Sequence, residues 1–331
     1  MPSPSVSIII PVHNGGPAFV RCLTAILRNQ PPPKEIIVAA NGCRDRSIAA
    51  ARLAGAQVVV FPEPIGPAAA RNAAARGAVG DMLFFVDADV ALHPDALGRV
   101  RDCFRKDPDL AACFGSYDDR PPETNFFSQY KNLFHHFIHQ RGFSDAATFW
   151  AGCGAVRREV FMALGGFDEA YARPCIEDIE LGYRMRAGGF KIRLEKTLLA
   201  THLKRWTLFS LLHTDIFDRA LPWARLIFQS RALRDDLNTK LRDRFSVLMV
   251  ALLTVFLTLA LITALPVWPA MLAAALLIVL NLDWYRFTLR RKGLIWTIPA
   301  IGWHWCYYGY SGIAFAYAAG EHLMKRCRKR S

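Results

Sequence analysis

The chain has 331 residues, of which 53% are hydrophobic, with 41 lysines and arginines against 28 aspartates and glutamates. This length allows one large domain plus a further segment, and the positive charge suggests nucleic acid, anionic lipid or a phosphorylated ligand as partner. The basic residues cluster at 231–244, 286–292 and 325–330, each beside an apolar stretch, with no helix-turn-helix or zinc-finger spacing. The composition therefore favours a membrane surface and argues against nucleic acid.

The eight cysteines are scattered along the chain and form no CxxC pair. This usage is typical of reduced thiols in the cytoplasm rather than of disulfides. The N-terminal sequence MPSPSVSIIIPV has no basic segment followed by a long apolar core, so we expect a first β-strand there and not a signal peptide. The N-terminal domain is expected on the cytoplasmic side of a membrane.

Short apolar runs alternate with helical stretches in the first part of the chain. They predict strands at 5–10, 35–40, 57–61 and 81–89, and helices at 18–29, 46–55 and 66–77. Strands separated by helices form parallel sheets, which bind ligands at the carboxyl ends of their strands. The polar segments PVHNGG, AANGCRD and DAD all lie at such ends. We therefore expect a ligand site there, and the lack of GxGxxG after the first strand argues against a dinucleotide dehydrogenase.

The segment FFVDADV places Asp87 and Asp89 directly behind an apolar run. In an extended chain alternate side chains point the same way, so both carboxylates are expected on one face, with Ala88 on the other. Ionised carboxylates are not buried without a partner. The pair therefore either faces solvent at an exposed strand end or faces something cationic.

A stretch of 37 residues, 246–282, contains no charged residue. As a helix it would be roughly 55 Å long, close to two crossings of a hydrocarbon core of about 30 Å. Pro266 and Pro269 interrupt its middle as a turn would, and Trp284 and Tyr285 follow where an interfacial aromatic belt is expected. We interpret the stretch as a membrane hairpin with both ends cytoplasmic; a buried hairpin in a soluble protein is the alternative.

The last apolar stretch, 294–320, contains Pro299 and many tryptophans and tyrosines. If it crossed the membrane, the basic tail would lie outside, against the positive-inside tendency. We expect helices lying in the membrane interface, with a third span as the alternative.

Four segments of the chain carry a family resemblance. They are VSIIIPVHNGG, GPAAARNAAARGAVGDMLFFVDADV, GCGAVRREVFMALGGFDE and CIEDIELGYRMRAGGFKI, in this order. Together they closely resemble family 2 glycosyltransferases of the GT-A fold, over about residues 5–206. The resemblance implies an α/β fold with a mostly parallel sheet and helices on both faces. We expect a GT-A domain at 1–230, a basic linker at 231–245, a transmembrane hairpin at 246–285 and an interfacial or third membrane segment at 286–331.

The resemblance also implies a nucleotide-sugar donor and a divalent cation, Mg²⁺ or Mn²⁺, that neutralises the diphosphate leaving group. Asp89 would bind the metal, and Asp87 would reach the nucleotide ribose or the metal. The residues implied around the nucleotide are Pro11, His13 and Asn14 in the first loop, Asp45 in the second, and Arg71, for which a solvated helix arginine is the competing interpretation.

One position departs from the family pattern. Relatives commonly read DDGS after the second strand, with an acid contacting uracil, whereas this chain has Ala40 and Asn41 there. Asn41 can still offer an acceptor oxygen. A UDP-sugar remains the first choice of donor, with a GDP- or dTDP-sugar as the alternative.

The segment IEDIELGYRMRAGG has a helical period and ends at Gly188 and Gly189, a glycine C-cap pattern. Glu177 and Asp178 would stand at its N-terminal end, where the helix dipole favours carboxylates. By resemblance, Asp178 matches the general base that takes the proton of the acceptor hydroxyl, with Glu177 beside it. Ordinary charge at a helix start is the competing interpretation.

The resemblance places the acceptor near two further segments. In FWAGCGAV, Gly152 and Gly154 would let the backbone approach the sugar and Trp150 would stack on it, whereas a tight strand turn is the other explanation of the glycines. HLKRW resembles the family's QxxRW motif with His202 in place of Gln, which implies Arg205 and Trp206 near the acceptor and the diphosphate. His202 is either a ligand of the metal–diphosphate or a packing residue. We expect packing or interfacial roles for His135, His136 and His139.

These observations predict an inverting glycosyltransferase at the cell inner membrane, with a cytoplasmic catalytic domain and a lipid or lipid-linked acceptor. Asp178 favours a hydroxyl acceptor, because a polyprenyl phosphate, the alternative acceptor, needs no general base. A nucleotidyltransferase and a non-catalytic, membrane-tethered nucleotide-binding protein are the rival interpretations. Two spans are too few to enclose a polymer channel, so we expect the addition of one or a few sugars.

Overall fold

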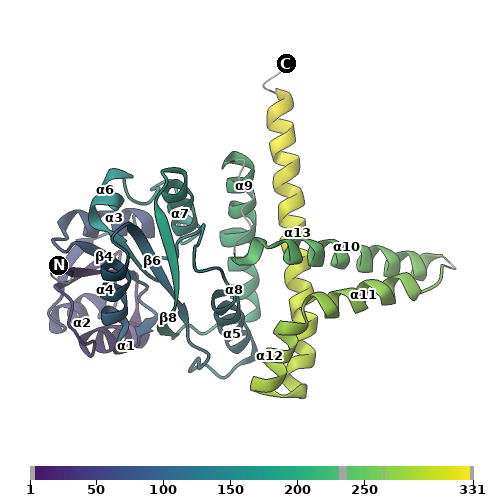
Figure 1. Ribbon diagram of the computed structural model, residues 1–331, viewed down its shortest axis with the longest axis horizontal. Helices are drawn as coiled ribbons and strands as arrows, with labels where there is room; N and C mark the ends of the chain where they lie inside the picture. The colour runs from purple at the N-terminus through teal and green to yellow at the C-terminus, as the bar shows by residue number, and fades with distance from the viewer. Residues whose placement is uncertain (1–3, 231–236, 264, 329–331) are drawn as a thin grey trace. The chain divides into compact units, whose positions relative to one another are not determined.

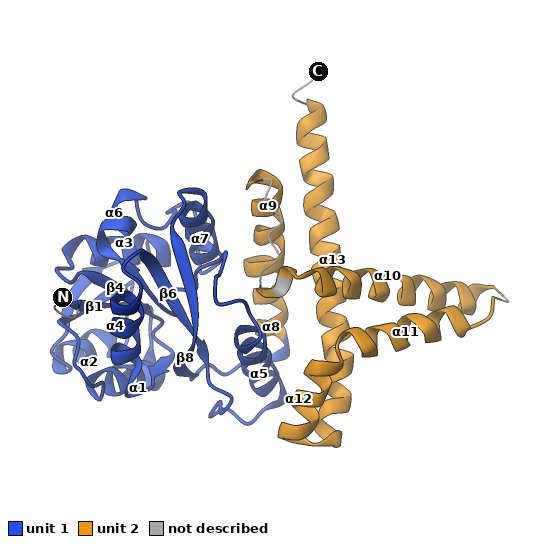
Figure 2. Cartoon of the chain, viewed as in Figure 1, with its two compact units in different colours: residues 1–208 blue, residues 209–331 orange. Residues whose placement is uncertain are grey.

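The computed structural model describes residues 4–230, 237–263 and 265–328, and the chain forms two compact units, Met1–Leu208 and Phe209–Ser331 (Figure 2). The expected domain boundaries stay predictions, and residues 231–236 of the basic linker expected at 231–245 lie outside the described residues.

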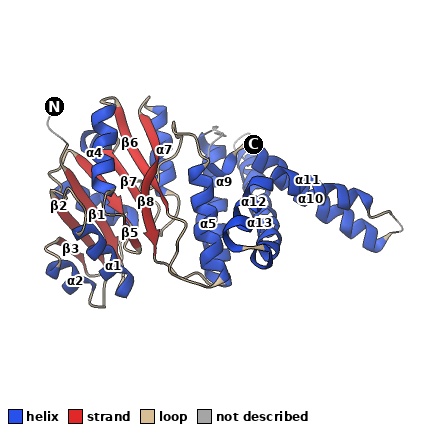
Figure 3. Cartoon of the chain, turned by 60° about the horizontal axis from the view of Figure 1, so that its bottom comes forward, coloured by secondary structure: helices blue, strands red, loops and turns tan. Residues whose placement is uncertain are grey.

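The first unit is built on an eight-stranded sheet with the order β3-β2-β1-β4-β7-β6-β8-β5 (Figure 3). The strands are β1 Val6–Val12, β2 Glu35–Asn41, β3 Gln57–Phe61, β4 Met82–Val86, β5 Val90–Leu92, β6 Leu110–Tyr117, β7 Cys153–Arg157 and β8 Lys191–His202. Strands β1 to β4 pair in parallel, as do β6 and β8, whereas β7 runs antiparallel between β4 and β6. The expectation of a mostly parallel α/β sheet is confirmed.

The central strands form because their sequences suit burial on both faces. β1 and β4 are almost continuous runs of aliphatic and aromatic residues, and nearly every position in them is buried. Such runs are typical of strands covered by helices on both faces of a sheet. The four strands and three helices expected from the sequence are all present.

The helices of the first unit connect the strands and pack against them (Figure 1). They are α1 Gly16–Leu27, α2 Ser47–Leu53, α3 Pro67–Gly77, α4 Ala96–Lys106, α5 Phe126–Gln140, α6 Arg158–Ala163 and α7 Glu177–Ala187. The strand directions put the carboxyl ends of β1, β2, β4, β6 and β8 at one edge of the sheet, and the candidate site lies there.

The second unit is helical. Its elements are α8 Leu208–His213, which begins at the boundary, the π-helix η1 Thr214–Ala220, α9 Leu221–Ser230, the 3₁₀ turn η2 Leu237–Thr239, α10 Leu241–Ile262, α11 Trp268–Leu280, α12 Leu282–Lys292 and α13 Leu294–Arg328. Helices α10 and α11 pack against each other and α13 packs against α9, α10 and α12. The break between α10 and α11 falls where the prolines predicted a turn.

One helix of the described residues, α10, is long and apolar enough by itself to cross a membrane. The second expected span falls on α11, which has only 13 residues; together with α12, after a bend of 68°, it passes the same test of length and composition as a bent pair. The last apolar stretch forms the single 35-residue helix α13, which contains Pro299.

A buried polar network lies at the bend between α11 and α12. Asn281 donates from Nδ2 to the Ser246 hydroxyl at 3.0 Å, and the Tyr308 hydroxyl donates to Asn281 Oδ1 at 2.9 Å. Tyr308 also lies 3.0 Å from Asp243 Oδ1. These contacts join α10, the bend and α13, so the bend is held by specific hydrogen bonds.

Candidate active site

Asp87 and Asp89 stand in a turn and not in a strand. β4 ends at Val86, and the Val90 amide donates to the Asp87 carbonyl at 3.0 Å, which closes the turn. The expectation that the two carboxylates share one strand face is therefore wrong, because strand alternation does not apply within a turn. Each carboxylate has its own partner, and each is about one-third exposed.

Arg71 connects Asp87 to helix α7. Its Nη2 donates to Asp87 Oδ1 and its Nη1 to Glu177 Oε1, both at 2.7 Å. The Arg71 and Glu177 side chains are only 7% and 5% exposed. Burial by itself would lower the pKa of the Arg71 guanidinium, but the charges of Asp87 and Glu177 outweigh it and raise that pKa.

The local sequence explains how Arg71 reaches this position. α3 begins with Pro67 after Gly66, whose φ of 87° suits glycine, and most of the helix consists of alanines, which favour helix formation. The small side chains let α3 pack closely on β1 and β2. Both terminal nitrogens of Arg71 are engaged with carboxylates, so Arg71 positions Asp87 and Glu177, and its expected place beside the nucleotide stays a prediction.

A second connection runs through the loop that contains Trp150, Ala151 and Gly152. The Asp87 amide donates to the Gly152 carbonyl at 3.3 Å, and the Ala151 amide donates to Asp178 Oδ2 at 3.0 Å. Asp178 is half-buried in the first turn of α7, as the sequence predicted, and Oδ1 accepts from the Ile179 amide at 2.8 Å. The loop therefore places the Asp87 backbone beside the carboxylate expected to act as base.

Asp89 faces His202. The two residues come from the ends of β5 and β8, where Val90 pairs with His202, and the Leu203 amide donates to the Asp89 carbonyl at 2.8 Å. Asp89 Oδ2 lies 3.8 Å from His202 Nε2. Burial would raise the pKa of the Asp89 carboxyl, but the neighbouring His202 and Lys204 outweigh it and keep that pKa below its usual value.

The Asp89–His202 pair fits a divalent cation whose remaining ligands come from a diphosphate and water. Within the described part of the chain, no three His, Cys, Asp or Glu side chains form a metal site by themselves. Mg²⁺ is commonly held by one or two protein ligands plus substrate phosphates and water. Two ligands about 2.1 Å from an octahedral ion are about 3.0 Å or about 4.2 Å apart, which brackets the observed 3.8 Å. Asp87 is occupied on one oxygen by Arg71, so Asp89 and His202 are the better ligands.

The first two loops are tied to each other. His13 Nδ1 donates to the Asn41 carbonyl at 2.6 Å, and Asn14 Nδ2 donates to His13 Nε2 at 3.2 Å. Asn41 is buried and its Oδ1 accepts from the Ile65 amide at 2.7 Å. The side-chain oxygen that was expected to contact the nucleobase therefore also holds the loop.

Asp45 joins the same pair of loops, and Pro11 lies within β1. Asp45 Oδ2 accepts from the Gly16 amide and Oδ1 from the Ser47 amide, both at 3.0 Å. Burial, which is slight here, would raise the pKa of Asp45, but these hydrogen bonds outweigh it and lower that pKa. His13, Asn14 and Asp45 all present exposed side chains, and Asp45 also fixes the loops.

The glycines expected to admit a sugar are explained by packing. A Cβ at Gly152 would come within 2.6 Å of the Trp150 ring, and one at Gly154 within 2.2 Å of the Trp150 carbonyl. Trp150 is 8% exposed and lies against Tyr117 and His135. The turn interpretation of these glycines is therefore the one that the geometry supports.

The residues of the HLKRW segment differ in burial, and the expected place of Arg205 and Trp206 near the acceptor and the diphosphate stays a prediction. Trp206 is buried, with the Lys204 ammonium 4.0 Å above its ring, and its amide donates to Ser128 Oγ at 2.7 Å. Arg205 is 75% exposed and lies 3.9 Å from Glu123. Lys204, which the sequence did not single out, adds to the effect of His202 in lowering the pKa of Asp89.

Other residues around the site were also missed from the sequence. Asp118, at the end of β6, accepts from Thr201 and lies 3.0 Å from His93 Nε2. The hydrogen bond raises the pKa of His93; burial would raise the pKa of Asp118, but the bonds from His93 and Thr201 lower it. Asp118, like Asp87, follows an apolar run, and this position is the one sequence signal that could have identified it.

The three histidines of α5 pack as expected. His136 Nδ1 donates to the Tyr117 carbonyl at 2.7 Å and His139 Nδ1 to the Gly115 carbonyl at 2.9 Å. The His135 ring lies against the Tyr117 and Trp150 rings.

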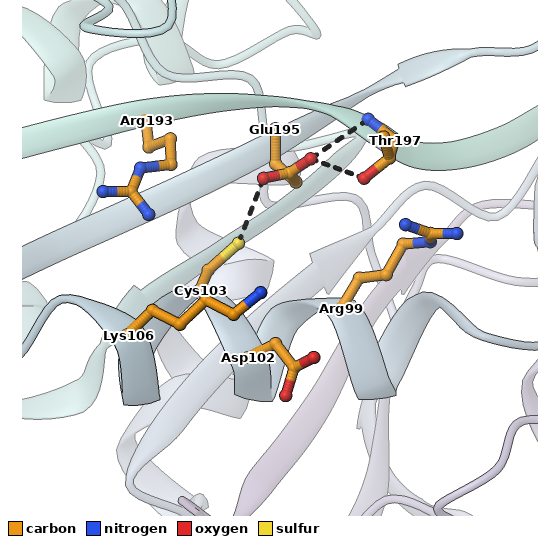
Figure 4. Close-up of a pocket in the computed structure, with 7 residues that line it drawn as sticks. All are labelled: Arg99, Asp102, Cys103, Lys106, Arg193, Glu195 and Thr197. Carbon is orange, nitrogen blue, oxygen red and sulfur yellow. Dashed lines mark hydrogen bonds between the residues drawn. The ribbon is translucent and has the colours of Figure 1, made fainter.

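A separate pocket lies between α4 and β8, away from these motifs (Figure 4). Cys103 donates to Glu195 at 3.6 Å, and Thr197 donates to Glu195 from its amide and hydroxyl. The residues that line it are Arg99, Asp102, Cys103, Lys106, Arg193, Glu195 and Thr197. Two of its three basic residues, Arg99 and Arg193, are paired with aspartates.

Comparison with known proteins agrees with this architecture. Residues 7–165 match the model of glycosyl transferase family 2. The chain is 26% identical over 228 residues to validoxylamine A glucosyltransferase from Streptomyces hygroscopicus subsp. limoneus, covering 58% of this chain and 50% of that protein. The chain thus spans about half the length of this relative.

Solved structures share the fold. The mannosyltransferase PcManGT from Pyrobaculum calidifontis, in complex with GDP-Man and Mn²⁺, aligns with a TM-score of 0.56 at 17% identity, covering 97% of this chain and 87% of that chain. S. aureus TarS 1–349 in complex with UDP-GlcNAc aligns with a TM-score of 0.50 at 16% identity, covering 68% and 66%. The fold is of the GT-A type, and residues 7–165 form a domain that matches glycosyltransferase family 2, a family of transferase enzymes.

Proposed function

We propose that the chain is an inverting glycosyltransferase that moves a sugar from a nucleotide-sugar donor to a hydroxyl group of a lipid or lipid-linked glycan. One observation carries the proposal: Arg71 and the Ala151–Gly152 loop join Asp87 to the helix that presents Asp178. A carboxylate suited to receive a proton therefore stands beside the end of β4, where parallel sheets bind ligands. The family match and the similar folds support this assignment.

The donor half comprises Asp87, Asp89, His202 and Lys204. A Mg²⁺ or Mn²⁺ ion held by Asp89 and His202 would neutralise the leaving diphosphate. Lys204 adds a further positive charge on the same side. Because the structural neighbours include proteins bound to GDP-Man and to UDP-GlcNAc, both nucleotides belong in a donor screen, with a UDP-sugar as the first choice.

Asp178 would act as the general base in a single displacement. Its carboxylate takes the proton of the acceptor hydroxyl while the acceptor oxygen bonds to the anomeric carbon. The bond from that carbon to the diphosphate oxygen breaks from the opposite face, which inverts the configuration. The nucleoside diphosphate leaves with the bonding electron pair.

The test of this function compares Asp178→Asn with Asp145→Asn, an exposed carboxylate paired with Arg186. Asn at 178 can still accept from the Ala151 amide, so a rate fall of roughly 10²–10⁴ would report the loss of the base. Release of pyrophosphate would instead identify a nucleotidyltransferase. A polyprenyl-phosphate sugar formed equally well by Asp178→Asn, or a long polysaccharide, would overturn the acceptor assignment.

We also propose that the second unit holds the enzyme at the cytoplasmic face of the cell inner membrane. The 22 residues of α10 extend for about 33 Å, enough for a hydrocarbon core of about 30 Å. Leu261 and Met271, near the turn of the α10–α11 pair, are 86% and 67% exposed. Replacing both with glutamate should release the protein from lipid vesicles in a flotation assay. Unchanged flotation would argue that the pair does not enter the membrane.

A further inference from the structure

The His202 ring must be oriented if it is to bind a cation beside Asp89. A histidine ring rotates broadly about its second side-chain torsion, so the strand alone does not aim Nε2. Metal-binding histidines are commonly oriented by a hydrogen bond from the other ring nitrogen. Among the described residues, contact with an aromatic ring takes the place of such a hydrogen bond for His202.

Tyr117 supplies this contact. Its ring stacks on His202 with the ring planes 8° apart and the centroids 4.3 Å apart. Both side chains are nearly buried, at 7% and 6% exposure. A parallel stack with so little space around it restricts the imidazole plane, and Nε2 then lies on the Asp89 side.

Tyr117 is itself held from several sides. The Trp150 ring meets it edge to face at 4.8 Å, and His135 lies 4.3 Å away on α5. At the next residue, the Asp118 amide donates to the Ala200 carbonyl at 2.8 Å, which fixes the end of β6 against β8. The stack therefore belongs to a rigid part of the sheet edge.

We propose that Tyr117 is a positioning residue that aims His202 at the cation and thereby favours Mn²⁺ over Mg²⁺. This inference rests on the proposed function. Imidazole nitrogen binds transition-metal ions better than it binds Mg²⁺, which prefers oxygen ligands. Without the stack, a rotated imidazole would leave Asp89, diphosphate and water as the ligands, a set that retains Mg²⁺ better than Mn²⁺.

The experiment measures Mn²⁺ binding to the purified full chain by electron paramagnetic resonance, with UDP and then with GDP present. Mg²⁺ affinity follows from competition. Tyr117→Leu should lower the Mn²⁺ affinity about 10- to 100-fold with a smaller change for Mg²⁺. Tyr117→Phe, which keeps the ring, should restore the affinity. Phe114→Leu removes another buried ring from β6 without touching the His202 stack, and serves as the matched control.

Co²⁺ absorption provides a second readout, because it senses nitrogen ligation directly. Tyr117→Leu should shift the spectrum toward that of His202→Gln, and the double variant should show no further loss. If Tyr117→Leu does not fold, Tyr117→Met fills more of the space without a ring.

If Tyr117→Leu keeps the Mn²⁺ affinity and the Co²⁺ spectrum of the wild type, the inference about Tyr117 is overturned, whereas the proposed metal site is not. Failure of the wild type to bind Mn²⁺ with either nucleotide, or binding that is unchanged in His202→Gln, would overturn the proposed metal site as well.

Discussion

Replacing Arg71 with methionine tests the connection between the two halves of the site. The change leaves Glu177 buried without its cation, and removing one partner of a buried ion pair costs about 3–5 kcal/mol. Asp87 is 33% exposed and can regain water, so we expect the lower end, about 3 kcal/mol. For a unit of about 200 residues this corresponds to a fall in Tm of about 6–12 °C.

The assay is chemical unfolding of the purified chain, followed beside Arg105→Met. Arg105 pairs with Asp102 at the surface, where both side chains are about half exposed, and such pairs contribute about 0–1 kcal/mol. If Arg71→Met lowers the free energy of unfolding by no more than Arg105→Met does, the reasoning is refuted.

The double variant Arg71→Met/Glu177→Leu separates stability from binding. Replacing a buried ion pair with apolar side chains is often neutral for stability, so the unfolding free energy should return toward that of the wild type. Asp87 remains without its partner in this variant, so affinity for a nucleoside diphosphate should stay low. Recovery of both properties would contradict a positioning role for Arg71.

Three further predictions concern other contacts. In steady-state kinetics, Lys204→Met should raise the donor KM several-fold and Arg205→Met should raise it less. A larger effect of Arg205→Met would instead support the family expectation that Arg205 lies near the diphosphate. Gly182→Ala would place a Cβ 2.4 Å from a backbone nitrogen of the neighbouring loop, so thermal unfolding should show a loss of about 1–3 kcal/mol, and an unchanged Tm would argue against this packing. The contact between His93 and Asp118 should stabilise the fold most between about pH 4 and 6.5, because it fades below as Asp118 is protonated and above as His93 loses its proton. Unfolding curves against pH should flatten in His93→Gln, and identical curves would contradict the pairing.

The first strands, and the place of Asp178 in the first turn of α7, could be predicted because local pattern determines them. An apolar run between helical stretches specifies a buried strand, and polar residues behind it mark the ligand edge. The start of α7 and its glycine end were likewise visible in a short segment. These features depend on residues that are close in sequence.

The partners of Arg71 could not be predicted in this way. Its contact with Glu177 joins residues 106 positions apart, and it exists because β7 inserts antiparallel between β4 and β6. The turn at Asp87 was missed because side chains alternate between the two faces of a sheet only as far as the strand continues. Tyr117 had no motif of its own, and its role depends on the pairing of β6 with β8.

The Ala151–Gly152 loop has a consequence for redesign of the enzyme. One short peptide touches the Asp87 backbone on one side and the Asp178 carboxylate on the other. Grafting this loop from a relative, with the aim of changing which acceptor is used, would also shift the part of the site that faces the donor. Under the proposed function, changes in this loop would therefore alter donor and acceptor preferences together, and libraries that vary it should be selected on both substrates.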